Sequence, residues 1–303
     1  MRLTFLALAG ALVMTAASAP PNKSGDKPAD TPPPAGLVSY KDLLARPAAK
    51  PDQRIAYGPH AEQFADLRLP AGPGPHPVIV LIHGGCWLAS LPSVELMAPM
   101  AEALRDEGYA VWSLAYRRIG EDGGGYPGTF QDVGAGIDAL RGLAPRYGLD
   151  LHRLVFSGHS AGGHLAVWAA QRDRLGRTSP LYSANPLLPQ GVVSLAGIND
   201  LEAYRASGPD ACGGPTTIDS LVDAAHRAAP YADTSPARLA RPGAKLVVIS
   251  GALDPIVPAR FGEAFAGHMG VKGRTLPGAG HFELIDPRST AWPAVRAALA
   301  EAH

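Results

Sequence analysis

The chain has 303 residues, 27 of them basic and 27 acidic, so its formal net charge at neutral pH is zero. Because no basic stripe is present, neither nucleic acid nor an anionic membrane surface is an expected partner. The two cysteines, Cys86 and Cys212, are too few for a zinc site without histidine ligands, and nothing in the sequence points to a metal or an organic cofactor.

The N-terminus, Met1 to Ala19, has the layout of a secretory signal peptide. Arg2 is followed by an apolar run from Leu3 to Val13, which is too short to span a bilayer comfortably, and then by small residues. Ala17 and Ala19 offer an Ala-x-Ala cleavage site, although the proline that follows is a poor residue directly after a cut. The alternative is an uncleaved N-terminal anchor.

Residues 20–36 are rich in proline, charged and small side chains, which predicts a flexible leader that cannot bury enough apolar surface to fold. Residues 37–303 are enough for one large domain with a single core, which we expect to be catalytic. The signal peptide predicts export to the periplasm or the medium, with no membrane contact after cleavage. No feature of the sequence specifies an oligomeric state.

Apolar runs alternate with segments of helical spacing through this domain. Strands are predicted at 64–69, 77–82, 110–116, 154–156, 192–195, 245–250 and 274–276. Helices are predicted at 93–107, 129–146, around 165–170, at 258–268 and at 291–300. This alternation predicts an α/β fold, a mostly parallel open sheet with helices on both faces. In such sheets the active site lies at the carboxyl ends of the strands.

A Gly-x-Ser-x-Gly turn, Gly158 to Gly162, joins the predicted strand 154–156 to a helix. So tight a turn needs glycine on both sides, because side chains there would strike the strand or the helix, and Ser160 is then held at the tip in a strained conformation. The helix N-terminus directs its free N–H groups at charge that develops on a substrate. We interpret the stretch as a nucleophile elbow; the alternative is an ordinary glycine-rich turn with a surface serine.

A nucleophilic serine requires a base and an acid that orients the base. His281, in a Gly-Ala-Gly-His loop after the last predicted strand, is the predicted base, and Asp254 is the predicted acid. The chain order Ser160, Asp254, His281 is that of α/β-hydrolases. Asp200 is the more serious rival for the acid, and Asp286 is a weaker one.

The tetrahedral intermediate of acyl transfer needs preorganised N–H donors for its oxyanion. The backbone N–H of Ala161 is one predicted donor, and those of Gly85 and Cys86 are the others, because Gly84 and Gly85 let bare backbone approach the substrate. His83 is expected to brace this loop through its ring nitrogens rather than to act as the base. A simple turn is the alternative for the His-Gly-Gly segment.

Four motifs together resemble a known superfamily. They are HGGCW at 83–87, GHSAGG at 158–163, GALDPIVP at 251–258 and GAGHFELI at 278–285. These residues, with the segment 116–133, look like the esterase branch of the α/β-hydrolases, which includes carboxylesterases, hormone-sensitive-lipase-like enzymes, feruloyl-esterase-like hydrolases and kynurenine formamidases. The resemblance extends from Phe64 to the C-terminus and implies the α/β-hydrolase fold and a Ser-His-Asp triad, but it is a poor guide to substrate.

The motif at 83–87 departs from the HGGG of many lipases in this branch, since Cys86 stands in the third position after the histidine. Trp87 follows, as in the HGGxW pattern of kynurenine formamidases. The favoured prediction is an exported serine hydrolase of small-molecule carboxylic esters. An arylformamidase is the alternative enzyme, disfavoured by export because tryptophan catabolism is intracellular, and a non-catalytic binding protein is disfavoured by the intact triad.

The segment 197–242 is polar and rich in glycine, proline and alanine, which predicts a minimal cap with one helix at 216–229. Trp87 and Tyr126 are predicted to line the site with aromatic surface, which suits a compact acyl group or an aromatic or sugar-borne ester. Export permits a disulfide between Cys86 and Cys212, since both lie in loops expected above the sheet edge. Two free thiols remain the alternative.

Overall fold

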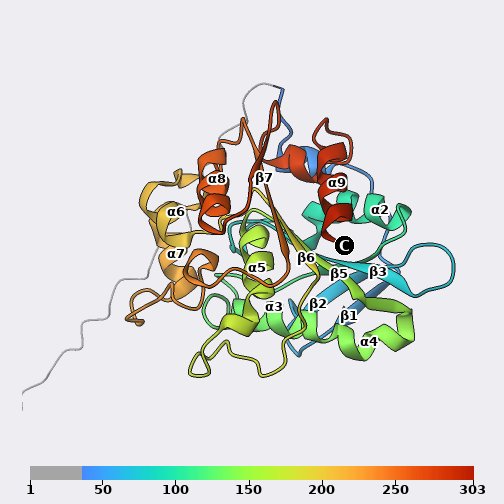
Figure 1. The fold of residues 1–303 in the computed structure, drawn as a ribbon, viewed down its shortest axis with the longest axis horizontal. Helices are drawn as coiled ribbons and strands as arrows, with labels where there is room; N and C mark the ends of the chain where they lie inside the picture. The colour runs from blue at the N-terminus through green and yellow to red at the C-terminus, as the bar shows by residue number, and fades with distance from the viewer. Residues whose placement is uncertain (1–35) are drawn as a thin grey trace, which may run out of the picture.

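The computed structural model describes residues 36–303, so the predicted signal peptide and all but the last residue of the predicted leader lie outside the described residues. Within these residues the sheet has eight strands in the order β1-β2-β4-β3-β5-β6-β7-β8. Figure 1 shows this sheet running through the middle of the molecule. The strands are β1 (Gln53–Ala56), β2 (Phe64–Arg68), β3 (His76–Ile82), β4 (Ala110–Leu114), β5 (Leu149–His159), β6 (Gly191–Leu195), β7 (Lys245–Gly251) and β8 (Arg274–Leu276). The β1–β2 and β2–β4 pairs are antiparallel, and the pairings from β4 to β8 are parallel, which confirms the predicted mostly parallel sheet.

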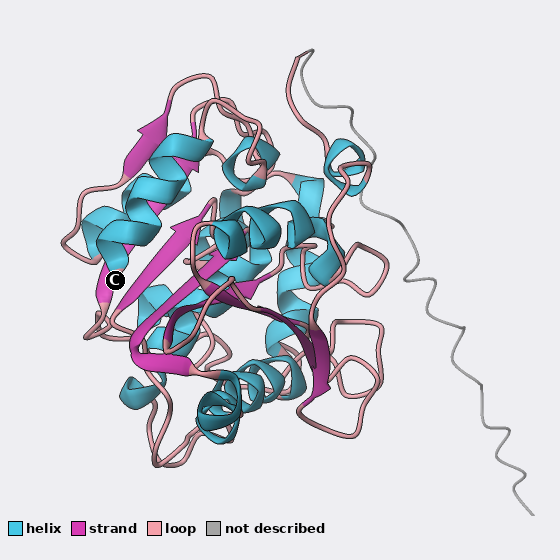
Figure 2. Cartoon of the chain, turned by 90° about the vertical axis from the view of Figure 1, so that its right-hand side faces the viewer, coloured by secondary structure: helices cyan, strands magenta, loops and turns pink. Residues whose placement is uncertain are grey.

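Helices cover both faces of the sheet, and Figure 2 shows the strands running between them. The α-helices are α1 (Tyr40–Leu44), α2 (Ala98–Asp106), α3 (Gly128–Asp138), α4 (Leu140–Tyr147), α5 (Ala161–Ala170), α6 (Leu201–Ser207), α7 (Gly214–Val222), α8 (Ala259–His268) and α9 (Trp292–Ala302). Among residues 36–303, the short 3-10 helices are η1 (Val94–Met97), η2 (Arg172–Arg174), η3 (Asp210–Cys212), η4 (Pro236–Arg238) and η5 (Phe282–Ile285).

Burial of the central strands follows from these two helical layers. Every residue of β4 and of β6 is buried. A parallel strand that is covered on both faces has a continuous run of apolar residues. The run PVIVLI at 77–82 therefore predicts the strand that the structure contains there, β3. Among the described residues, no helix is both long and apolar enough to cross a membrane.

Some element boundaries differ from those expected. The predicted helix 129–146 is two helices, α3 and α4, separated at Ala139, and the predicted helix 93–107 begins as the 3-10 turn η1. The sequence patterns missed α1 and β1. Both are short, and β1 is largely exposed, so neither shows a usable hydrophobic period.

The prediction of a single cap helix at 216–229 was wrong. Two helices, α6 and α7, contact each other and lie with α8 on the left-hand side of Figure 1. The Asp200 carboxylate begins α6 by accepting a hydrogen bond from the Ala203 N–H at 3.0 Å. α7 stops at Val222 because Asp223 adopts a left-handed backbone conformation, with φ of 52°.

Candidate active site

Ser160 lies at the sharp turn between β5 and α5, with φ of 56° and ψ of −121°. The glycines on either side leave no room for a side chain. A Cβ on Gly158 would lie 2.0 Å from the Gly162 carbonyl oxygen, and one on Gly162 would lie 2.0 Å from the Ile82 carbonyl oxygen. Ser160 therefore has the backbone geometry predicted for a nucleophile elbow, held by close contact of strand, turn and helix.

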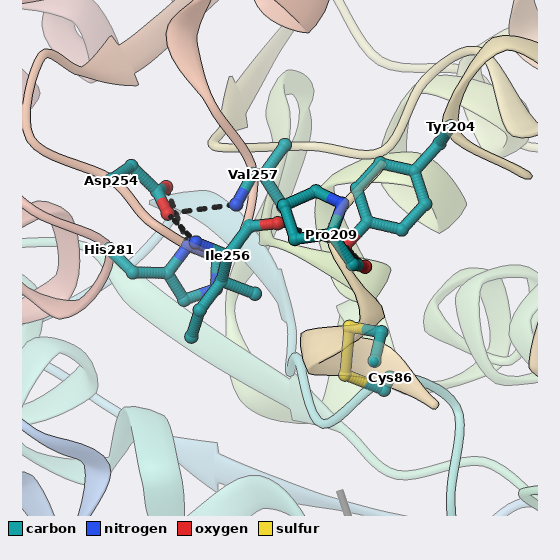
Figure 3. Close-up of a disulfide and its surroundings, with 8 residues drawn as sticks. Cys86, Tyr204, Pro209, Asp254, Ile256, Val257 and His281 are labelled. Atoms are coloured by element: carbon teal, nitrogen blue, oxygen red, sulfur yellow. Dashed lines mark hydrogen bonds and ion pairs between the residues drawn. A yellow bond between two sulfur atoms is a disulfide. The ribbon is translucent and has the colours of Figure 1, made fainter. Parts of the chain in front are cut away.

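His281 and Asp254 are buried together in the loops that follow β8 and β7, and the His281 Nδ1 is 2.6 Å from the Asp254 Oδ2. The backbone N–H groups of Ile256 and Val257 both donate to the other carboxylate oxygen, Oδ1, at 2.8 Å (Figure 3). An ionised carboxylate only accepts hydrogen bonds, so Nδ1 carries the proton and Nε2 is the basic nitrogen. This tautomer is the one that a general base needs.

His159, the residue before Ser160, links the turn after β5 to the loop that carries His281. The His159 Nε2 donates to the His281 backbone carbonyl at 3.0 Å, and the two imidazole centroids are 4.3 Å apart. Burial, with the neighbouring His281, lowers the pKa of His159 well below its usual range, so this ring stays neutral. Within the described residues, no hydrogen bond joins the Ser160 hydroxyl to His281.

The two rival acids are engaged elsewhere. Asp200 caps α6, as described above. The Asp286 Oδ2 pairs with the Arg46 guanidinium at 2.5 Å, and its Oδ1 accepts from the Arg288 N–H. Of the three candidate carboxylates, only Asp254 contacts His281.

The loop after β3 lies directly against Ser160, since a Cβ on Gly84 would be 3.2 Å from the Ser160 Cβ. Gly85, Cys86 and Trp87 follow with φ values of 102°, 51° and 58°. Within the described residues, the N–H groups of Gly85 and Cys86 make no hydrogen bond, which leaves both free to bind an oxyanion. Ala161 is the first residue of α5, where backbone N–H groups have no helical partner.

His83 braces this loop as predicted. Its Nδ1 donates to the Gly84 carbonyl at 2.7 Å, its Nε2 lies 3.3 Å from the Ser93 hydroxyl, and its ring stacks on Tyr116 with centroids 4.4 Å apart. The Tyr116 hydroxyl in turn donates to the His83 carbonyl at 2.9 Å. Both the ring and the backbone carbonyl of His83 are therefore held in place at the end of β3, where the loop turns toward Ser160.

The structure contains the disulfide between Cys86 and Cys212, which confirms that prediction over two free thiols. The bond spans 126 positions of sequence and ties the η3 turn of the cap to the loop after β3 (Figure 3). Both cysteines are buried. The cap is thus covalently attached to the loop that lies against Ser160, and reduction would release a large loop.

The two aromatic residues predicted to line the site behave differently. Trp87 has no exposed surface, and its ring packs edge-on against His164 with centroids 5.3 Å apart, so it supports the loop from behind. The backbone of Trp87 is left-handed, with φ of 58°, and its role as a substrate contact remains a prediction. Tyr126 is half-buried, with the Arg227 guanidinium 3.6 Å from its ring centroid and its hydroxyl on Asp233.

No group of three or more His, Cys, Asp or Glu side chains in residues 36–303 is arranged to hold a metal ion. The groups gathered around Ser160 are a serine hydroxyl, an imidazole, a carboxylate and backbone N–H donors.

Two buried histidines predict a pH dependence of stability. Burial lowers the pKa of His83 to about 3 and that of His164 to about 4, from 6.5. Unfolded histidine takes up a proton near pH 6.5 while these two stay neutral, so the unfolded state binds more protons and stability falls as the pH drops below 6.5. Each histidine contributes a slope of up to about 1.4 kcal/mol per pH unit.

Urea unfolding at pH 7, 6 and 5 measures this slope. His164→Gln is expected to reduce the change of the free energy of unfolding with pH, since glutamine has no imidazole to take up a proton when the chain unfolds. His152→Gln, on an exposed side chain, is the control and is expected to leave it unchanged. A free energy of unfolding that stays level from pH 7 to pH 5 in the wild type would contradict the prediction.

The elbow at the carboxyl end of a parallel strand, inside a sheet of this order, defines the chain as an α/β-hydrolase. More particularly, it belongs to the BD-FAE family, whose model matches residues 65–269. This is a family of α/β-hydrolase esterases, as the motif resemblance implied.

Individual relatives agree with this assignment. The esterase LipC of Mycobacterium tuberculosis is 27% identical over 283 residues, which are 87% of this chain and 66% of that protein. The isoprenylcysteine alpha-carbonyl methylesterase ICME of Arabidopsis thaliana is 31% identical over 116 residues, 38% of this chain and 26% of that protein. The chain thus spans less than two thirds of either relative.

Among solved structures, the crystal structure of esterase B from Lactobacillus rhamnosis (HN001) superposes with a TM-score of 0.71 at 21% identity, covering 86% of this chain and 87% of that one. A propionate-bound esterase, Est2 from Thermogutta terrifontis, gives a TM-score of 0.63 at 20% identity, with 82% and 91% covered. At these identities the likeness establishes the shared fold.

Proposed function

We propose that this chain is an exported serine hydrolase that cleaves carboxylic esters with short or compact acyl groups. Ser160 is the nucleophile, His281 the base and Asp254 the residue that orients it. The observation that carries the proposal is the 2.6 Å contact between the His281 Nδ1 and Asp254, with His281 held against the residue next to Ser160. No metal or organic cofactor takes part in the proposed reaction.

In the first half of the reaction, the Ser160 Oγ attacks the ester carbonyl carbon while its proton passes to the His281 Nε2. Asp254 stabilises the imidazolium that forms. The carbonyl oxygen becomes an oxyanion, which binds the N–H groups of Gly85, Cys86 and Ala161 at the helix N-terminus. His281 then protonates the leaving alcohol, and the acyl group remains on Ser160.

The second half repeats these steps with water. His281 removes a proton from a water molecule, which attacks the acyl carbon, and the same N–H donors stabilise the second oxyanion. The intermediate collapses, His281 returns the proton to the Ser160 oxygen, and a carboxylic acid leaves. The chain's own groups are regenerated after each turnover.

A fluorophosphonate probe tests the proposal directly, because it reacts with activated serines. We expect one label per chain, located on Ser160 by mass spectrometry of the digested protein. A folded protein that takes no label, or takes it on another serine, would contradict the assignment. A non-catalytic binding protein of this fold is the outcome that the absence of labelling would favour.

An arylformamidase is the second candidate, and the observation that favours it is the HGGxW sequence around Trp87. The catalytic groups would be the same, since both reactions pass through an acyl-enzyme. A parallel assay with formylkynurenine and with a panel of carboxylic esters separates the two. Faster turnover of formylkynurenine than of every ester would replace the esterase assignment.

Export rests on the predicted signal peptide at 1–19 and gains support from the Cys86–Cys212 disulfide, since such bonds persist in oxidising compartments. Fractionation of producing cells is expected to place the mature protein outside the cytoplasm, with an N-terminus within a few residues of position 20.

The acyl-chain preference is a further prediction. The disulfide attaches the cap beside the nucleophile, so the cap is poorly suited to swing open for a long chain in the way of a lipase lid. We expect acetyl and butyryl p-nitrophenyl esters to be hydrolysed with a much higher kcat/KM than palmitoyl esters, without activation at an oil interface. A kcat/KM that rises steadily from two carbons to sixteen would show that the prediction is wrong.

A further inference from the structure

The hydroxyl of Tyr204, on the cap helix α6, donates to the Ile256 carbonyl at 2.9 Å. Ile256 lies two residues beyond Asp254, in the loop after β7. A contact therefore runs from the cap to the loop that carries the proposed catalytic acid, as Figure 3 shows. The side chain of Tyr204 is far from solvent, with 3% of its surface exposed.

The Asp254 Oδ1, the carboxylate oxygen that does not face His281, accepts two hydrogen bonds, and both come from this loop. The N–H groups of Ile256 and Val257 hold Oδ1 at 2.8 Å each, and this leaves Oδ2 directed at the His281 Nδ1. The orientation of the carboxylate thus depends on where the Ile256 peptide lies. Tyr204 holds the carbonyl of the same residue whose N–H holds Asp254.

Backbone hydrogen bonds from the N–H groups of Leu253 and Asp254 restrain the loop before the carboxylate. The next residue, Pro255, is exposed and has no N–H to donate. The Tyr204 hydroxyl adds a restraint beyond this proline, at the Ile256 carbonyl.

Tyr204 is itself firmly held. Its ring packs on Phe261 of α8 with centroids 5.3 Å apart, and Cys212, a short distance further along the cap, is bonded to Cys86. The segment 204–212 is therefore attached at one end to the acid loop and at the other to the loop with the proposed oxyanion donors. A rigid support of this kind keeps catalytic groups in productive geometry.

We propose that Tyr204 is a positioning residue for the reaction, acting on His281 through the Ile256 peptide and Asp254. The proposal rests on the function proposed above. The Tyr204 hydroxyl bonds to loop carbonyls and its ring packs on Phe261, so in the described part of the chain it makes no hydrogen bond to Ser160 or His281. Its loss should therefore lower the rate of the chemical step and leave substrate binding almost unaltered.

Tyr204→Phe removes only the hydroxyl and keeps the packed ring. We expect kcat for p-nitrophenyl acetate to fall by about 10-fold to 100-fold, as for a misplacement of catalytic groups of up to about 1 Å, with KM within about 2-fold of the wild type. The rate of fluorophosphonate labelling should fall by a similar factor. The far-downfield proton NMR signal of the His281 Nδ1 proton, which reports on the bond to Asp254, should shift.

Tyr57→Phe is the matched control. The Tyr57 hydroxyl also donates to a backbone carbonyl, that of Ala115, at 2.7 Å, but it follows β1 at the opposite end of the sheet. We expect a comparable loss of stability and no change in kcat, labelling rate or the NMR signal. Active-site titration with the fluorophosphonate probe measures the concentration of folded enzyme in each sample. Every kcat is then calculated per folded enzyme molecule.

If the Tyr204→Phe protein matched the wild type in kcat, labelling rate and NMR signal, and lost only stability as Tyr57→Phe does, Tyr204 would be a structural residue and the proposal would be overturned. Failure of the wild type itself to be labelled at Ser160 would instead overturn the proposed function. The two failures are therefore distinguishable in one set of measurements.

Discussion

Replacement of Ser160 by alanine is expected to lower kcat for a short-chain ester by about 10⁶-fold and to abolish fluorophosphonate labelling. Members of a triad act as a unit, so removal of the nucleophile removes nearly all that the unit provides. The residual rate comes from the N–H donors near Gly85, Cys86 and Ala161, which still bind the oxyanion. Steady-state kinetics on purified protein measures the loss.

Asp254→Asn should be nearly as damaging, with a loss of about 10⁴-fold, because an amide favours the wrong tautomer of His281. Asp200→Asn is the matched control. Asparagine is an equally good cap for α6, so kcat is expected within about 2-fold of the wild type. The assignment of the acid would be wrong if Asp200→Asn crippled the enzyme while Asp254→Asn was mild.

Loss of the disulfide is the second change for which we expect a large effect. It closes a loop of 126 positions, and the chain-entropy relation gives a stabilisation of about 5 kcal/mol for a loop of that length. The double variant Cys86→Ser/Cys212→Ser should therefore unfold at a much lower urea concentration. Its kcat should also fall by about 10-fold or more, because the loop that carries the Cys86 backbone N–H, a proposed oxyanion donor, is no longer bonded to the cap.

The single variants Cys86→Ser and Cys212→Ser serve as controls for the bond itself. Each already lacks the disulfide, so each should lose about as much stability as the double variant, and reduction of the wild type should reproduce the loss. Equal urea midpoints for the double variant and the wild type would contradict the prediction. Additive losses in the two single variants would instead show that the separate side chains matter more than the bond.

The sheet and its layers could be predicted from the sequence because their signals are local. Strands such as 77–82 and 245–250 are continuous apolar runs, and the glycines at Gly158 and Gly162 identify the elbow because only a residue without a side chain fits there. Short or exposed elements were missed because they carry no such local signal. A helix such as α6, with only Leu201 and Tyr204 buried, is too short to show a period.

Contacts between residues far apart in sequence could be identified only in the folded chain. Three aspartates follow or adjoin predicted elements and were candidates for the acid, namely Asp254, Asp200 and Asp286. Only the folded loops show that Asp254 is the one in contact with His281. The burial of Trp87 depends on the left-handed backbone of its loop, which no local pattern specifies for a tryptophan.

Local patterns were enough to predict the fold class, the elbow and the groups available for chemistry, since hydrophobic period and glycine spacing act over a few residues. The partner of His281, the pairing of the two cysteines and the contact of Tyr204 with the acid loop were decided by the tertiary structure. Each of these contacts joins two segments that are separate in the sequence. Where those segments lie is fixed by the packing of the whole sheet, so no local pattern predicts that they meet.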